Sequence, residues 1–135
     1  MWTWEKTSRI IEGQGGSQAS IDQWSLVNSD GVRIDIIGVN RERAGTLCYS
    51  ESGKSFSFYA TRHSADGREQ LCQFTVYGTP SLSHMFADGT SDESRRETLQ
   101  RIKRNISDAL PIIPQLSDGP NACPVSGFSF RDFDL

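Results

Sequence analysis

Few side chains in this sequence could perform acid–base or nucleophilic chemistry. Histidine is best suited to proton transfer near neutral pH, and the chain has only His63 and His84. Cys48 or Cys72 could form a nucleophilic pair with either histidine. Both cysteines stand in alternating apolar segments, where a cysteine usually acts as a small buried hydrophobe. We therefore predict no catalytic residue and favour a protein that is not an enzyme.

The sequence gives no clear signal for a metal or a cofactor. His84, Asp88, Asp92 and Glu93 form a loose acidic group, which helix capping and a solvated loop explain better than metal binding does. Residues 13–17 are rich in glycine, but they match neither the Rossmann nor the Walker pattern and no convincing helix follows them. We predict no metal site and no cofactor, and a simple turn at residues 13–17.

The aromatic, arginine and acidic residues of the sequence favour a binding function. Aromatic and arginine side chains contribute much of the energy of protein interfaces, and binding residues are often carried by loops. Charges at a rim also guide a partner of opposite charge. The predicted partner-binding residues are Glu42, Asp66, Asp88, Asp92, Trp24 and Tyr59. The candidates for lining a ligand pocket are His84 and Arg95; alternatively, the stem of Arg95 covers the edge of the core.

Composition narrows the class of protein. The chain has 135 residues, 36% of them hydrophobic, which is enough for one domain. Its formal charge of −3 argues against a nucleic-acid partner. Its first residues have no leader pattern, and no apolar stretch is long enough to span a membrane. Cys48, Cys72 and Cys123 are odd in number and widely spaced, so we expect reduced thiols and a cytoplasmic location.

Residues 90–110 have the only clear helical period. Leu99, Ile102 and Ile106 follow the spacing of three and four that places side chains on one helical face. Thr90 and Glu93 have the spacing of a capping box, in which each side chain accepts a hydrogen bond from a free backbone amide. The spacing therefore predicts one amphipathic helix over residues 90–110.

The segment before this helix predicts strands. Apolar residues alternate with polar ones over several short stretches, and Asp-Gly and Ser-Gly pairs separate these stretches as hairpin turns do. Residues 1–78 are thus expected to form an antiparallel meander, with 79–89 as a bridge to the helix. Residues 111–135 read as a proline-rich linker followed by an ordered aromatic tail, which could add a strand. The predicted fold is a single α+β domain, with a curved antiparallel meander of five to seven strands packed on one C-terminal helix.

Three functions remain open. The first is a protein-binding module without chemistry of its own, since a small, acidic, turn-rich α+β domain has the proportions of bacterial immunity proteins, which neutralise a toxin by covering its active site. This is an analogy of size and character, and a fold does not determine a function. The second is a small-molecule-binding protein or cofactor-free enzyme with a pocket between sheet and helix. The third is a subunit of an assembly, and the protein itself is expected to be a monomer or a homodimer.

Overall fold

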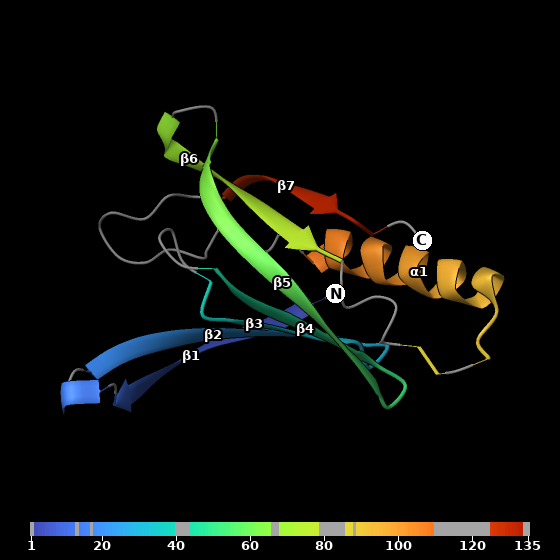
Figure 1. The fold of residues 1–135 in the computed structure, drawn as a ribbon, viewed down its shortest axis with the longest axis horizontal. Coiled ribbons are helices and arrows are strands. Elements are labelled where there is room, and N and C mark those ends of the chain that lie inside the picture. Colours follow the sequence, from blue (N-terminus) through green and yellow to red (C-terminus); the bar gives the residue numbers. More distant parts are fainter. Residues whose placement is uncertain are drawn as a thin grey trace.

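The computed structural model describes residues 2–12, 14–16, 18–39, 44–65, 68–78, 86–87, 89–109 and 125–133. These residues form one seven-stranded sheet and a helix, α1 (Asp92–Ala109), as Figure 1 shows. The strands lie side by side in the order of the sequence. They are β1 (Trp2–Glu12), β2 (Gln18–Asn28), β3 (Arg33–Ile37), β4 (Gly45–Glu51), β5 (Lys54–Ala65), β6 (Arg68–Tyr77) and β7 (Val125–Arg131). The predicted α+β fold, a sheet packed on one C-terminal helix, is confirmed.

The six strands from β1 to β6 pair with their sequence neighbours in antiparallel register. Tight turns make this possible. Between β2 and β3 the Asn28 side chain accepts hydrogen bonds from the amides of Asp30 and Val32, at 3.0 and 2.9 Å. Gly31 completes this turn with a φ of 80°, a conformation that costs glycine little. The turn signals of the sequence thus mark real chain reversals.

One face of the sheet, here called the inner face, carries the core. Cross-strand pairing places Leu26, Ile34, Tyr49 and Phe56 in one row, and each of them is buried. A neighbouring row runs from Trp24 through Ile36 and Leu47 to Phe58. The sheet curls so that β5, β6 and β7 rise around α1 (Figure 1). The apolar stripe of the helix, Leu99, Ile102, Ile106 and Ala109, is buried with these rows in one cluster.

The helix begins slightly later than the sequence predicted, and with a different cap. The hydroxyl of Ser91 accepts a hydrogen bond from the Ser94 amide at 3.1 Å, which makes Ser91 the capping residue. Thr90 instead donates its hydroxyl hydrogen to the carbonyl of Ala87 at 2.6 Å. The predicted capping box of Thr90 and Glu93 is therefore wrong by one residue, because two adjacent hydroxyl residues competed for the position.

The aromatic tail supplies the last strand. β7 pairs with β6 in parallel, since the chain crosses over through α1 between these two strands. Beyond β7, Phe133 returns to the core with 4% of its surface exposed. Its ring stacks on Phe58 at 4.9 Å and meets the edge of Phe130 at 5.0 Å between centroids. The tail is thus an integral part of the fold, and its parallel pairing is the one departure from the predicted antiparallel pattern.

Candidate functional site

A polar cluster of four side chains joins the helix to the sheet. Tyr49 donates its hydroxyl hydrogen to Glu51 at 2.6 Å, and the side-chain amide of Asn105 donates to the Tyr49 oxygen at 2.7 Å. Arg101 donates from Nε to both carboxylate oxygens of Glu51, at 3.1 and 3.0 Å, and also from Nη2. The cluster therefore connects β4 to α1 through a bidentate ion pair and a buried phenol.

The surroundings fix the charge of these groups. Burial, and then the hydrogen bond to Glu51, raise the pKa of Tyr49 to about 12. The hydrogen bonds from Arg101 outweigh burial and hold the pKa of Glu51 below its ordinary value. At neutral pH the cluster thus contains a neutral phenol, a carboxylate and a guanidinium that satisfy one another. This arrangement positions α1 and leaves no poised base or nucleophile among its members.

A shallow hollow of about 300 Å³ lies beside the cluster. Its walls include Asp30 and Val32 from the turn before β3, Ser52 after β4, and Arg104 of the helix. Opposite charges balance within it, because Glu51 already neutralises Arg101. The hollow can accept a small polar group, but its charged walls do not select one class of ligand.

The opposite face of the sheet, here called the outer face, has a different character. Its residues alternate with those of the core along β1 to β6, and they point away from α1. The register assigns these residues with described side chains to it: Thr3, Glu5, Thr7, Gln23, Ser25, Val27, Arg33, Asp35, Ile37, Thr46, Cys48, Ser50, Ser55, Ser57, Tyr59, Thr61, Gln73, Thr75 and Tyr77. Most are hydroxyl residues, and the charged members are Glu5, Arg33 and Asp35.

An ion pair lies within the outer face. Arg33 Nε donates to the Asp35 carboxylate at 2.9 Å, and the Ser25 hydroxyl donates to the same carboxylate at 2.6 Å. Gln23 also reaches this carboxylate, at 3.4 Å. Burial would raise the pKa of Asp35, but the hydrogen bonds from Arg33 and Ser25 outweigh it and hold that pKa below its ordinary value. The pair is therefore fixed in place by the sheet.

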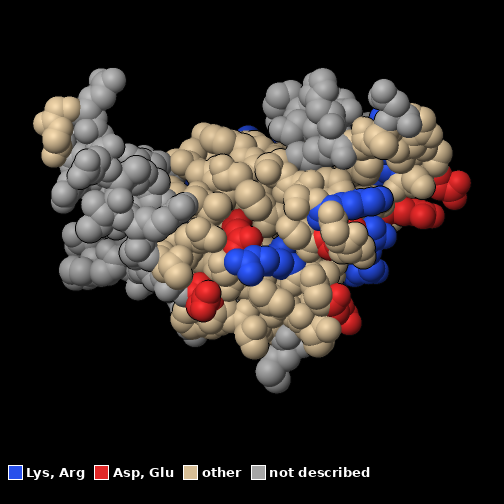
Figure 2. All heavy atoms as spheres, turned by 90° about the horizontal axis from the view of Figure 1, so that it is seen from below, with Lys and Arg blue, Asp and Glu red and all other residues tan. Residues whose placement is uncertain are grey.

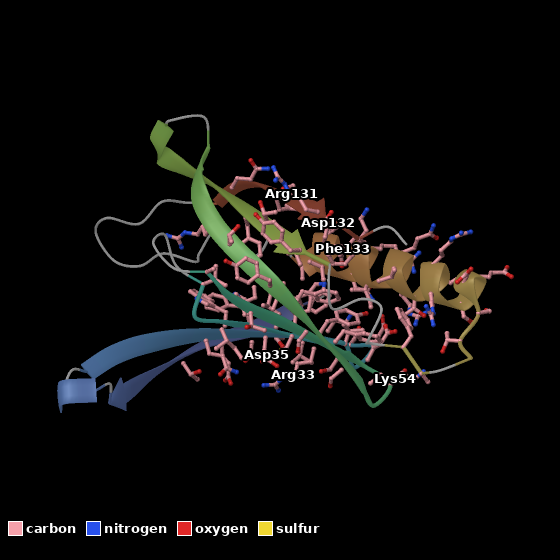
Figure 3. All side chains as sticks on the ribbon, viewed as in Figure 1. Arg33, Asp35, Lys54, Arg131, Asp132 and Phe133 are labelled. Carbon is pink, nitrogen blue, oxygen red and sulfur yellow. The ribbon has the colours of Figure 1, made fainter. Side chains whose placement is uncertain are left out.

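Among the described side chains, charge is scarce on this side of the molecule. In Figure 3, Arg33 and Asp35 project from β3 on the side away from α1. Figure 2 views the molecule from that side, where an extended uncharged surface surrounds a small group of charges. Other charges gather toward the end that carries the start of α1. Farther along the outer face, Tyr59 and Tyr77 are 5.4 Å apart between ring centroids, and Tyr59 is 54% exposed.

The described part of the chain includes four of the residues predicted for binding or for a pocket. Tyr59 lies exposed on the outer face, and Asp92 is exposed at the start of α1. Trp24 lies in the core with 7% of its surface exposed and is not part of the outer face. The guanidinium of Arg95 lies 5.7 Å from the centroid of Phe86, where the side chain covers the edge of the core. These four residues do not form one site.

The other predicted residues, Glu42, Asp66, Asp88 and His84, lie outside the described residues. The sequence did not predict the cluster of Glu51 and Arg101, because Glu51 stands beside a Ser-Gly turn signal and Arg101 lies outside the apolar stripe of the helix. One signal was present in the sequence. Glu51 follows Tyr49 at the strand spacing of two, so both side chains had to share the inner face.

The described part of the chain holds no group of three or more histidine, cysteine, aspartate or glutamate side chains that could bind a metal ion. No helix in this part of the chain is long and apolar enough to cross a membrane. Comparison with protein-family models, with curated proteins and with solved structures finds no match. The two faces of the sheet are therefore the features of the molecule that bear on its function.

Proposed function

We propose that the protein is a non-enzymatic binding module that holds another protein against the outer face of its sheet. The observation that carries this proposal is the extent of a sheet face whose described side chains are mainly hydroxyl and tyrosine groups with few charges. Thr3, Thr46, Ser57 and Tyr59 are exposed on it. Binding surfaces of antibodies combine tyrosine with serine in this way, and charges are depleted at the centre of interfaces. A sheet also holds these groups rigidly, which lowers the entropy lost on binding.

The finer proposal is that the partner is a bacterial toxin and that the protein neutralises it by covering its active site. Support comes from the size of the chain and from its formal charge of −3, which suits a basic partner. Asp92 is exposed at the start of α1 and could meet such a partner at the rim of a contact. We place the protein in the cytoplasm on the sequence argument alone.

The test uses one variant on the outer face and one matched control. Ser57 lies exposed on β5, and Ser57→Arg places a bulky charge on the outer face. Gln100→Arg makes the same change of charge on the exposed side of α1. We expect tagged wild type and Gln100→Arg to capture the same partner from source cells, and Ser57→Arg to lose it. Tyr59→Ala should weaken the purified complex roughly tenfold or more, as a tyrosine anchor does.

The inhibitory role needs its own readout. If the captured partner has a toxic activity, wild type and Gln100→Arg should inhibit it, whereas Ser57→Arg should not. A partner retained equally by all three folded proteins would show that the outer face is not the binding surface. A bound metabolite recovered without a partner would favour the second candidate, a small-molecule-binding protein that uses the hollow beside Arg101.

A further inference from the structure

The edge strand β1 offers a long row of backbone groups for pairing. Within the described residues it pairs with β2 alone, in an unbroken register from Trp2 and Asn28 to Glu12 and Gln18. Prolines and β-bulges are common devices that keep the edges of sheets from pairing. The sequence of β1 has no proline, and its register with β2 has no bulge. Such an edge accepts another extended strand through main-chain hydrogen bonds.

We propose that β1 pairs with β1 of a second copy of this chain, antiparallel and centred on Thr7. Thr7 is the midpoint of the strand, so this register brings its whole length into contact. A two-fold axis through Thr7, perpendicular to the sheet, closes the dimer and lets no third copy join at this edge. The inner faces of both copies then lie on the same side of a continuous sheet.

The charge pattern of β1 is complementary to itself in this register. Position 5, a glutamate, stands opposite position 9 of the second copy, an arginine, and symmetry makes this pair twice. Position 6, a lysine, meets a serine at position 8. Opposite charges placed directly across two strands stabilise their pairing, whereas like charges weaken it. The charges on this edge therefore favour the pairing of β1 with β1 of a second copy and do not prevent it.

Other two-fold registers lack this match. Two residues that stand directly opposite each other in paired strands must point to the same side of the sheet. Because side chains alternate along a strand, a two-fold axis must then pass through one residue and the same residue of the second copy. An axis through Lys6 places that lysine against itself, and an axis through Glu5 places two glutamates together. An axis through Ser8 opposes Glu5 to an isoleucine and shortens the overlap. The register centred on Thr7 thus combines the longest overlap with paired charges.

An exposed aromatic side chain supports the same register. Trp4 lies on the inner side of β1, with its ring 5.2 Å from that of Trp24, yet it is 42% exposed. In the proposed dimer, position 4 stands opposite position 10 of the second copy, an isoleucine. An aromatic residue opposite a β-branched one is a favourable cross-strand pair. Dimerisation would therefore cover a large apolar side chain that a single copy leaves at the edge.

Exchange of the two charges tests this proposal. Glu5→Arg places arginine opposite arginine, and Arg9→Glu places glutamate opposite glutamate, whereas the double variant restores opposite pairs. Sedimentation equilibrium over the micromolar-to-millimolar range measures the dimer dissociation constant of each protein. We expect wild type to dimerise, each single variant to dimerise roughly tenfold more weakly or worse, and the double variant to recover most of the loss. Circular dichroism and a thermal melt establish that each variant is folded.

Glu97→Arg, an equal change of charge on the exposed side of α1, serves as the control and should dimerise like wild type. A wild type that stays monomeric throughout this range overturns the proposal. A dimer that both folded single variants keep unchanged shows that β1 is not the interface. Failure of the folded double variant to recover, when the single variants are weakened, overturns the register centred on Thr7.

Discussion

Glu51 is a buried charged residue that links strand β4 to the helix α1. Its carboxylate accepts hydrogen bonds from Arg101 of the helix and from Tyr49 of the same strand. A carboxylate of lowered pKa stabilises the folded state above the pKa of the unfolded chain, and this stabilisation is lost as the pH falls through the folded pKa. Stability should therefore depend on this residue at neutral pH and much less in acid.

Glu51→Gln tests this dependence. At neutral pH we expect the substitution to lower the free energy of unfolding by about 2 kcal/mol, because it removes a hydrogen-bonded charge from its partner. Below the ordinary glutamate pKa of 4.5, wild type should approach the variant as Glu51 becomes protonated. Urea denaturation at a series of pH values measures both effects. Glu97→Gln on the exposed helix side is the control, and a difference from wild type that stays constant with pH would contradict the prediction.

At the scale of elements, the start of α1 depends on one hydroxyl. Ser91→Ala removes the oxygen that accepts the Ser94 amide, and should cost about 1 kcal/mol of stability. Thr90→Ala removes a hydroxyl whose hydrogen bond lies outside the helix, to Ala87, and should cost less. Paired thermal melts of the two variants check this order. If Thr90→Ala lost more stability than Ser91→Ala, Thr90 would be the capping residue, as the sequence predicted.

The aromatic tail is the second element whose contribution can be measured. Phe133 is held between Phe58 and Phe130, so Phe133→Ala should lower the free energy of unfolding by about 3 kcal/mol. Phe128→Ala, on the preceding strand β7 and 39% exposed, should cost much less. Chemical denaturation of both variants provides the comparison. Equal and small effects would mean that the tail adds little to the core.

The helix and the strands could be predicted from the sequence because the spacing of apolar residues differs between the two kinds of element. The stripe of Leu99, Ile102 and Ile106 predicted the helix, since a helix must bury one face. Contacts between elements were less accessible, because Glu51 and Arg101 are far apart in the chain and nothing local marks them as a pair. The parallel pairing of β7 was hidden for the same reason. Of the candidate surface, Tyr59 was predicted as a binding residue, whereas the ion pair of Arg33 and Asp35 was not.

At the scale of the whole molecule, the protection of backbone amide hydrogens against exchange with solvent should vary across the sheet. The middle strands carry the fully buried Leu47, Tyr49 and Phe58 and have a neighbour on each side. Amide groups there should exchange with solvent only through global unfolding, whereas those of the edge strand β1 should exchange faster at high dilution. Hydrogen exchange at rising protein concentration provides the measurement. Slow exchange in β1 at every dilution would contradict this ranking of the strands.

The proposed dimer would change how the whole molecule binds. Pairing through β1 leaves the two outer faces on one side of a continuous sheet. A partner with two equivalent contact surfaces could then engage both copies at once, and the second contact would form at a high effective concentration. Comparison of partner affinity for wild type at concentrations below and above its dimer dissociation constant would reveal this gain, because the outer face is then the same in both measurements.

The parallel strand β7 has a consequence for how the protein is made. During synthesis β6 leaves the ribosome well before β7, because the whole of α1 lies between them. Until β7 arrives, the nascent chain presents the bare edge of β6, with Phe74 and Val76 lacking their neighbours Phe128 and Phe130. Newly made chains crowded on one messenger would thus be most prone to associate wrongly during this interval. Slower translation of the helix would lengthen the interval without altering the finished protein.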